Sequence, residues 1–501
     1  FVDNGYEIQI INLVNTNRSH LWNCLQTVII EYKSAMKGDK DLSQCNKLIA
    51  SLASVFTDNP KSDPIWPDSA RQLLIAMILF LLEFSYKHNL MDKINMYSVY
   101  NFFIEFGTHE EVKVQNGAKT MVNALDAIFQ SLPVGSPAKS AYAASQFSAG
   151  ETRSSIFTTL ASNINIFGAD TGVSKLTSGN QIDFDKLINP EKPCAIFMVV
   201  PDEDISRHVI ASLFVNQCYN RLAELSRNYP NKKLPQRVIF VLDELGSMVR
   251  IPVMDTKIQV GAGRNILFNL FVQDLNQLET KYGDVAQTIR AGCGNVVYIN
   301  TLENKTNEYI STLLGTETLE YQTYSGHIHD IVEHKNYNWE NRSLISPSQL
   351  TRLKFGETIT KRQRCHPIRT KFEPFYNFNI PITPESEIKL DLISKSLESS
   401  LMPFDKIWKM IDMNPPITRT DETLTGIYRE DYHNKLPQQS TVISIVIREI
   451  NEITNGEFHE ALSCSDYVCA INIVKKLKRI KRINEDSAKI ALQHINSLSN
   501  F

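Results

Sequence analysis

Two adjacent carboxylates, Asp243 and Glu244, directly follow a short apolar run in this 501-residue chain. The run, Val238 to Leu242, is rich in β-branched residues and is typical of a buried strand in a parallel sheet. Open α/β sheets place their ligands at the carboxyl ends of such strands. An acidic pair there is suited to phosphoryl chemistry, in which one carboxylate holds a divalent metal ion and the other polarises an attacking water. The alternative is a helix-capping Asp beside a solvated Glu.

A second apolar run, Ile266 to Val272, follows a glycine-containing helical segment and ends in Gln273. If the two runs form neighbouring parallel strands, Gln273 lies at the same edge of the sheet as the acidic pair. An amide at that place is suited to sensing the terminal phosphate of a nucleotide. The pair of runs therefore predicts a nucleotide site more strongly than the acidic run does alone.

The composition is that of an ordinary soluble globular protein with room for two to four domains. Hydrophobic residues make up 43% and charged residues 21%, and the net charge of -3 predicts no global nucleic-acid-binding surface. The eight cysteines form no CxxC motif, and several lie in apolar runs, which favours reduced thiols in a cytosolic protein. The longest apolar run, Leu73 to Leu82, is about half of the roughly 20 residues that a membrane span needs, so it predicts a buried helix.

Strand patterns that alternate with helix patterns predict an α/β fold with a doubly wound, mostly parallel sheet. No strand pattern stands out between Asp58 and Phe167, and helices are expected there, including one over Ala118 to Gln130. Alternating residues after Gly315, in TLEYQTYS and ETITKRQR, predict an antiparallel hairpin at the sheet edge. The predicted domains are 1–57 (first part of a nucleotide-binding domain), 58–170 (all-α insertion), 171–378 (its remainder), 379–438 (Pro-containing linker) and 439–501 (helical tail).

The segments between the strands resemble the soluble part of type IV coupling proteins, the TraG/TraD-like family of conjugative DNA-pumping ATPases. The resemblance covers about residues 1 to 375, and its specificity comes from the order and spacing of many short pieces. These pieces are Trp22-Asn23-Cys24-Leu25, Asp63-Pro64 to Leu82, Thr152 to Ile156, Ala195 to Asp204, Val241 to Leu245 with Ile251-Pro252, Gly263-Arg264-Asn265, Val272-Gln273 with Leu275 and Gln277-Leu278, and Asn295 before Leu314-Gly315.

The resemblance implies a RecA-like motor domain with an inserted all-α domain, which forms hexamers with ATP sites between subunits. It implies that Asp243 is linked to Mg²⁺, that Glu244 activates water and that Gln273 is the sensor. Arg264 is a weaker candidate for a group that reaches a neighbouring subunit's phosphate, because a guanidinium is always charged and bidentate. The alternative for Arg264 is a surface salt bridge.

One feature departs from the family pattern: the 501 residues contain no GxxxxGK[ST] phosphate loop. Gly261-Ala262-Gly263-Arg264 lacks the Lys and the following hydroxyl, so it does not replace that loop. In the family, the loop and the transmembrane helices precede the point that corresponds to Phe1. We therefore expect an N-terminally truncated member that carries half of an ATP site and binds ATP weakly or not at all by itself.

Two polar clusters outside this region are further candidates. Six basic residues share a helical stretch with apolar residues and form a candidate surface for a partner, the alternative being a solvated helix face. They are Lys475, Lys476, Lys478, Arg479, Lys481 and Arg482. A second cluster, His327, His329 and His334 with Asp330 and Glu333, lacks the full ligand pattern of a metal site, so a solvated edge is favoured.

The predicted function is that of the cytoplasmic part of a conjugative coupling protein, located at the cytoplasmic face of the bacterial inner membrane, with this part of it soluble. The resemblance implies a relaxase, single-stranded DNA and components of the type IV secretion channel as partners, and ATP and Mg²⁺ as cofactors. Two alternatives stay open. One is a non-catalytic docking module, and the other is a related hexameric DNA translocase.

Overall fold

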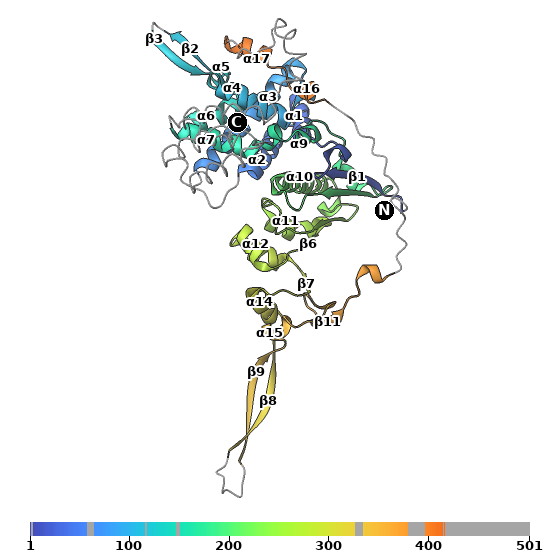
Figure 1. The fold of residues 1–501 in the computed structure, drawn as a ribbon. Coiled ribbons are helices and arrows are strands. Elements are labelled where there is room, and N and C mark those ends of the chain that lie inside the picture. Colours follow the sequence, from blue (N-terminus) through green and yellow to red (C-terminus); the bar gives the residue numbers. More distant parts are fainter. Residues whose placement is uncertain are drawn as a thin grey trace, which may run out of the picture. The chain divides into compact units, whose positions relative to one another are not determined.

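The computed structural model of this chain contains two pairs of parallel strands (Figure 1). β1 (Glu7–Asn12) pairs with β4 (Cys194–Val199), in a register that sets Glu7 beside Cys194 and Asn12 beside Val199. β5 (Val238–Leu242) pairs with β6 (Ile266–Leu270), in a register that sets Leu242 beside Leu270. The structure describes residues 1, 4–57, 65–115, 118–146, 151–325, 334–378, 396–413 and 415.

The pairing of β1 with β4 joins strands that are far apart in sequence, and the predicted insertion lies between them. The segment forms, in order, η2 (Thr16–Arg18), α1 (Gln26–Met36), α2 (Ser43–Thr57), α3 (Ile65–His88), η3 (Met91–Lys93), α4 (Met96–Thr108), β2 (Glu110–Gln115), β3 (Ala118–Asn123), α5 (Ala124–Ser131), α6 (Pro137–Gln146), α7 (Glu151–Ile164), α8 (Ile166–Ala169), α9 (Thr171–Leu176) and η4 (Phe184–Ile188). Helices thus dominate this segment, as its sequence predicts.

The β2–β3 hairpin corrects the expectation of helices alone between Asp58 and Phe167. Its antiparallel register sets Val112 beside Met121, and residues 118–123, predicted as the start of a helix, form its second strand. The missed signal is local. The run EEVKVQ alternates with period two, and Asn116-Gly117 separates it from the next run, which is the strongest short-range sign of a hairpin.

α3 is buried on nearly all sides and organises the helical segment. Its segment Trp66–His88 is long and apolar enough to cross a membrane by length and composition alone, with a mean hydropathy of 1.4 over an 18-residue window, but 67% of that window is buried inside the protein. Phe80 packs its ring against Phe84, Phe102 and Phe129, with centroids 5.4–5.9 Å apart. The prediction of a buried helix here is therefore confirmed.

The α/β pattern resumes after β4. The elements are η5 (Ile205–Arg207), α10 (His208–Ser226), η6 (Pro230–Lys232), β5, α11 (Met254–Gly261), η7 (Ala262–Arg264), β6, α12 (Leu275–Tyr282), α13 (Val285–Gly292), β7 (Asn295–Tyr298) and α14 (Asn304–Leu314). Strands and helices thus alternate in the predicted order. One face of the parallel strands is exposed: Phe197 and Val199 on β4 are 40% and 42% exposed, and Ile239 and Val241 on β5 are 51% and 62% exposed.

Two antiparallel hairpins follow α14, where the sequence predicted one at the sheet edge. β8 (Thr316–Ser325) pairs with β9 (His334–Ser343), and after α15 (Pro347–Leu350), β10 (Glu357–Arg362) pairs with β11 (Ile368–Lys371). Within the described residues, the second hairpin is the one that joins an earlier strand, because β10 also pairs with β7. The two alternating runs named in the sequence thus belong to different hairpins (Figure 1).

Residues 396–413 pack on the inserted helices, although the sequence pattern indicated an irregular linker. After η8 (Phe375–Asn377), the chain forms α16 (Leu397–Ser400) and α17 (Asp405–Ile411). Trp408 stacks on Phe106 with centroids 4.2 Å apart, and its indole N–H donates to Glu105 Oε1 at 2.6 Å. The chain divides into two units, Phe1–Asn414 and Pro415–Phe501, and beyond Pro415 the second lies outside the described residues. The finer domain boundaries stay predictions.

Candidate functional site

The acidic pair lies in the turn that leaves β5. Asp243 and Glu244 follow Leu242 directly and are both exposed. Glu244 has a φ of 52°, a left-handed conformation that is uncommon for a residue with a side chain and that costs on the order of 1 kcal/mol. Among the described residues, neither carboxylate forms an ion pair with Lys, Arg or His. Both carboxylates are therefore available to a ligand.

Gln273 lies at the neighbouring strand end, because β5 and β6 are parallel. Two further backbone bonds extend the ladder past the strands: Phe271 N–H donates to Leu242 O at 3.1 Å, and Leu245 N–H donates to Phe271 O at 3.0 Å. Asp243 and Glu244 lie between Leu242 and Leu245, the two residues that form these bonds. The predicted acidic pair and the predicted sensor are thus brought to one edge of the sheet.

Gln277, in the first turn of α12, orients Gln273. The Gln273 N–H donates to Gln277 Oε1 at 3.3 Å, and Gln277 Nε2 donates to Gln273 Oε1 at 3.1 Å. Asp274 caps this helix by accepting the Gln277 N–H at 2.8 Å. The helix start therefore holds the amide side chain of Gln273 in one orientation. Sequence reasoning noted Gln277 only as part of the family resemblance.

Gly246 is required by the close approach of Gln277. A Cβ at position 246 would lie 2.1 Å from Gln277 Oε1. Gly246→Ala is expected to displace Gln277, to break both of its bonds to Gln273 and to lower the free energy of unfolding by about 1 kcal/mol. Denaturant unfolding measures the stability, and NMR of the side-chain amides detects the release of Gln273.

Gly263→Ala is the matched control, because a Cβ there meets nothing within 4 Å. It should leave the Gln273 amide signals unchanged and should not lower the free energy of unfolding. A Gly246→Ala protein with native stability and native Gln273 amide signals would contradict the arrangement.

Side chains from three helices hold the loop that follows the acidic pair. Lys281 donates to Met248 O, Ser212 donates to Val249 O, Lys257 donates to Pro252 O, and Tyr282 Oη accepts the Ile251 N–H at 3.2 Å. Carbonyls of an irregular loop need such partners when they are buried. These contacts fix the chain that leaves Glu244 and were not foreseen from the sequence.

Arg264 does not lie with the other three predicted site residues. It ends η7, just before β6 begins, so it is at the opposite end of the strand from Gln273, and the five-residue strand between them is itself roughly 16 Å long. Its Nη1 donates to Ala223 O, near the end of α10, at 3.2 Å. Within one chain, Arg264 therefore does not serve the edge that carries the acidic pair.

The other candidates from the sequence are largely outside the described residues. This applies to the six basic residues of the tail and to His327, His329, Asp330 and Glu333. His334 is the first residue of β9. Across the part of the chain that the structure describes, no group of three or more His, Cys, Asp and Glu residues is placed to hold a metal ion.

The family described as "Type IV secretory system Conjugative DNA transfer" matches residues 3–400 of this sequence. The chain belongs to this family. Protein VirD4 of Rhizobium radiobacter is 21% identical over 371 residues, which cover 73% of this chain and 49% of VirD4. Conjugal transfer protein TraG of Escherichia coli is 26% identical over 216 residues, which cover 40% of this chain and 34% of TraG. The chain thus spans about half the length of VirD4.

The fold of this type IV coupling protein agrees with a solved structure. Plasmid coupling protein TrwB, in complex with a non-hydrolysable ATP analogue, matches 73% of this chain and 74% of its own, with a TM-score of 0.51 and 16% identity. This likeness confirms the predicted RecA-like α/β fold.

The family segment at Trp22–Leu25 has a packing role in this coupling protein. Trp22 is 2% exposed and meets Phe214 edge-on, with centroids 5.0 Å apart. Asn23 Nδ2 donates to Ile94 O at 2.7 Å, and Gln217 Nε2 donates to Cys24 O at 2.7 Å. The segment therefore joins α10 to the inserted helices.

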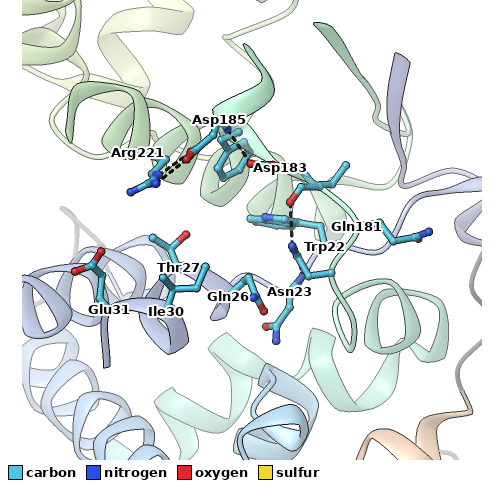
Figure 2. Close-up of a pocket in the computed structure, with 13 residues that line it drawn as sticks. Trp22, Asn23, Gln26, Thr27, Ile30, Glu31, Gln181, Asp183, Asp185 and Arg221 are labelled. Atoms are coloured by element: carbon cyan, nitrogen blue, oxygen red, sulfur yellow. Dashed lines mark hydrogen bonds and ion pairs between the residues drawn. The ribbon is translucent and has the colours of Figure 1, made fainter. Parts of the chain in front are cut away.

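A cavity of about 310 Å³ lies beside this segment (Figure 2). Its charged wall is already paired, because Arg221 donates to both carboxylate oxygens of Asp185 at 2.7 and 2.8 Å. The residues that line it are Trp22, Asn23, Gln26, Thr27, Ile30, Glu31, Asn180, Gln181, Ile182, Asp183, Phe184, Asp185 and Arg221. The candidate site formed by Asp243, Glu244 and Gln273 lies elsewhere, at the ends of β5 and β6.

Proposed function

We propose that this chain is the motor part of a conjugative coupling protein, which hydrolyses ATP to drive a relaxase–DNA substrate into a type IV secretion channel. Membership of the conjugative DNA transfer family supports the biological setting. The observation that carries the enzymatic part is the placement of Asp243, Glu244 and Gln273 at the adjacent ends of β5 and β6. Acids and an amide at that edge are the groups that nucleotide hydrolysis uses.

The exposed carboxylates fit Mg²⁺, which prefers hard oxygen ligands and binds through one or two carboxylates together with phosphate oxygens. Asp243 would hold the ion, which supplies charge neutralisation on the phosphates when it is bound. Glu244 would orient the attacking water and take up its proton. Gln273, held by Gln277, would donate a hydrogen bond near the reacting phosphate, and Arg264 would serve a neighbouring subunit's phosphate.

The chain alone is expected to bind ATP weakly or not at all, because its sequence has no GxxxxGK[ST] motif. Without that loop, the backbone nest, the phosphate Lys and the Mg²⁺-binding hydroxyl are missing. A titration with fluorescent ATP measures this. Micromolar affinity for the 501-residue chain would contradict the expectation.

We propose the partners from membership of the conjugative DNA transfer family. The complete motor would form a homohexamer at the cytoplasmic face of the inner membrane, and it would contact a relaxase, single-stranded DNA and channel components. Contacts to DNA would be electrostatic and largely independent of sequence, so binding should weaken steeply with salt. The proposed division into 1–57, 58–170, 171–378, 379–438 and 439–501 assigns the motor to the first and third segments.

The basic run of the tail, Lys475 to Arg482, is the proposed surface for an acidic partner. Replacing its six basic residues with Gln is expected to weaken binding of single-stranded DNA by at least about tenfold at low salt, because each lost cation removes a phosphate contact. Fluorescence anisotropy with labelled DNA measures this, and relaxase and anionic vesicles are tested in parallel. Unchanged binding of the DNA, the relaxase and the vesicles would show that the basic run is not the partner surface.

A non-catalytic docking module is the second candidate, favoured by the missing phosphate loop. On this view the helical segment and the tail bind protein substrates, and the chain never hydrolyses ATP. The two candidates differ in one measurement: joining a phosphate-loop segment of the family to the chain should produce ATPase activity if the motor is correct and none if the chain is a docking module.

A further inference from the structure

His208, the first residue of α10, lies between the two strand ends that flank the candidate site. Its side chain is buried, with 5% of the residue exposed. Its Nε2 is 2.7 Å from Pro201 O, which lies just beyond β4, and its Nδ1 is 3.2 Å from Ser247 O, in the loop beyond β5. One ring therefore bridges the turn after β4 and the loop that carries Glu244.

Both partners of this ring are carbonyl oxygens, which accept hydrogen bonds and cannot donate them. A neutral imidazole carries one N–H, so it satisfies one of these carbonyls and turns a lone pair toward the other. The doubly protonated ring donates to both.

We infer that His208 is a positioning residue, a proton-dependent clamp that holds the loop after Glu244 against the end of β4. The connection to Glu244 is short. The Ser247 N–H donates to Glu244 O at 2.8 Å, and Ser247 Oγ lies 3.5 Å from Glu244 Oε2. Loss of one ring proton breaks one arm of the clamp and frees the loop. Any effect of the clamp on catalysis rests on the proposed function, in which Glu244 activates water. The clamp itself is independent of that proposal.

Charged groups of both signs lie on the elements that carry the clamp and its partners. Arg207 is neutralised by Asp170, with its Nε donating to Asp170 Oδ2 at 2.7 Å, and burial lowers the pKa of Lys281. The groups on the elements that pack here are Asp202, Glu203 and Asp204 in the turn after β4, Arg207 beside the ring, Glu244 in the loop, and Lys281 on α12.

The protonation state can be measured directly on the full chain. With ¹⁵N-labelled histidine, NMR should show protons on both ring nitrogens of His208 in the state in which the loop is held. Hydrogen exchange of the peptide from Leu245 to Ile251, corrected for intrinsic rates, should then accelerate by about tenfold as the pH is raised through the point where His208 loses a proton. The peptide that covers β6 should not follow this change.

His208→Gln supplies the second measurement, because a Gln side chain cannot donate in both directions. The loop should exchange about tenfold faster than in the native chain and lose its pH dependence. The exposed His366→Gln is the matched control and should retain the native profile. A singly protonated His208 with a protected loop, or native loop behaviour in His208→Gln, would overturn the clamp. If the variant fails to fold, the ring protonation in the native chain decides alone.

These readouts separate the clamp from the motor. Neither uses nucleotide, so an absence of ATPase activity after a phosphate loop is joined to the chain would overturn the proposed function and leave the clamp standing. ATPase activity that depends on Glu244, found together with a singly protonated His208, would support the proposed function and overturn the clamp.

Discussion

Glu244→Gln is expected to lower the turnover of ATP by about 10²- to 10⁴-fold in a protein in which a phosphate-loop segment of the family has been joined to this chain. The amide keeps the shape of the side chain but cannot take the proton of the attacking water. Because Asp243 and the joined loop would still bind nucleotide and metal, the affinity for ATP should change little. Steady-state phosphate release measures turnover, and a titration with a non-hydrolysable analogue measures binding.

Glu203→Gln is the matched control, an exposed carboxylate in the turn after the neighbouring strand β4. It should leave both turnover and binding unchanged. Normal turnover in Glu244→Gln would remove the role assigned to this residue. A protein that also loses nucleotide binding would place Glu244 among the binding groups.

Lys257→Met is expected to stabilise the protein at neutral pH by about 1–3 kcal/mol. Lys257 is 5% exposed, and burial lowers its pKa from 10.5 to about 8, with Asp255 opposing the shift. Its Nζ has a carbonyl, Pro252 O, and the ring of Tyr219, 5.4 Å away, as compensation. A charge buried with so little compensation destabilises the fold, and each pKa unit corresponds to about 1.4 kcal/mol.

The pH dependence follows from the direction of this shift. Since the pKa of Lys257 is lower in the folded chain, the unfolded chain binds more protons between about pH 8 and pH 10.5. The contribution of Lys257 to stability therefore rises with pH through that window and is at its most unfavourable below it.

Denaturant unfolding at pH 7 and at about pH 10 tests this. Lys257→Met should show its largest gain at pH 7 and a much smaller one at pH 10, whereas the exposed Lys305→Met should change stability little at either pH. An equal or greater loss of stability in Lys257→Met at pH 7 would show that the bond to Pro252 outweighs the burial of the charge.

The strands that carry the candidate site could be predicted because their signals are local. The apolar runs at Val238 and Ile266 are short and bounded by polar residues, the first is rich in β-branched residues, and the structure forms strands there. The β2–β3 hairpin was missed because the residues of its second strand continue into an apolar helical pattern, so the helix was predicted to begin at Ala118. Its alternating charges and the Asn-Gly step carried the correct signal.

Pairings between distant segments could not be predicted in the same way. The alternating runs after Gly315 read as strands, but nothing in their spacing states that the first pairs with residues 334–343 and the second with β7. α16 and α17 lie in a proline-containing stretch, and their packing on α4 depends on the aromatic face that Phe106 presents. Contacts of this kind arise from surfaces that exist only after the helices have formed.

The sequence by itself determined the fold class, the family and the acidic residues at the end of β5, because periodicity, turn residues and motif order are properties of the chain. Tertiary structure alone decided how these residues are held. It brought Gln273 to the edge that carries the acidic pair, left Arg264 at the opposite end of the strand, and aimed both nitrogens of His208 at carbonyl oxygens. The reason is physical: the direction of a parallel strand, and the partners of a buried polar atom, are set by neighbours that are remote in the sequence.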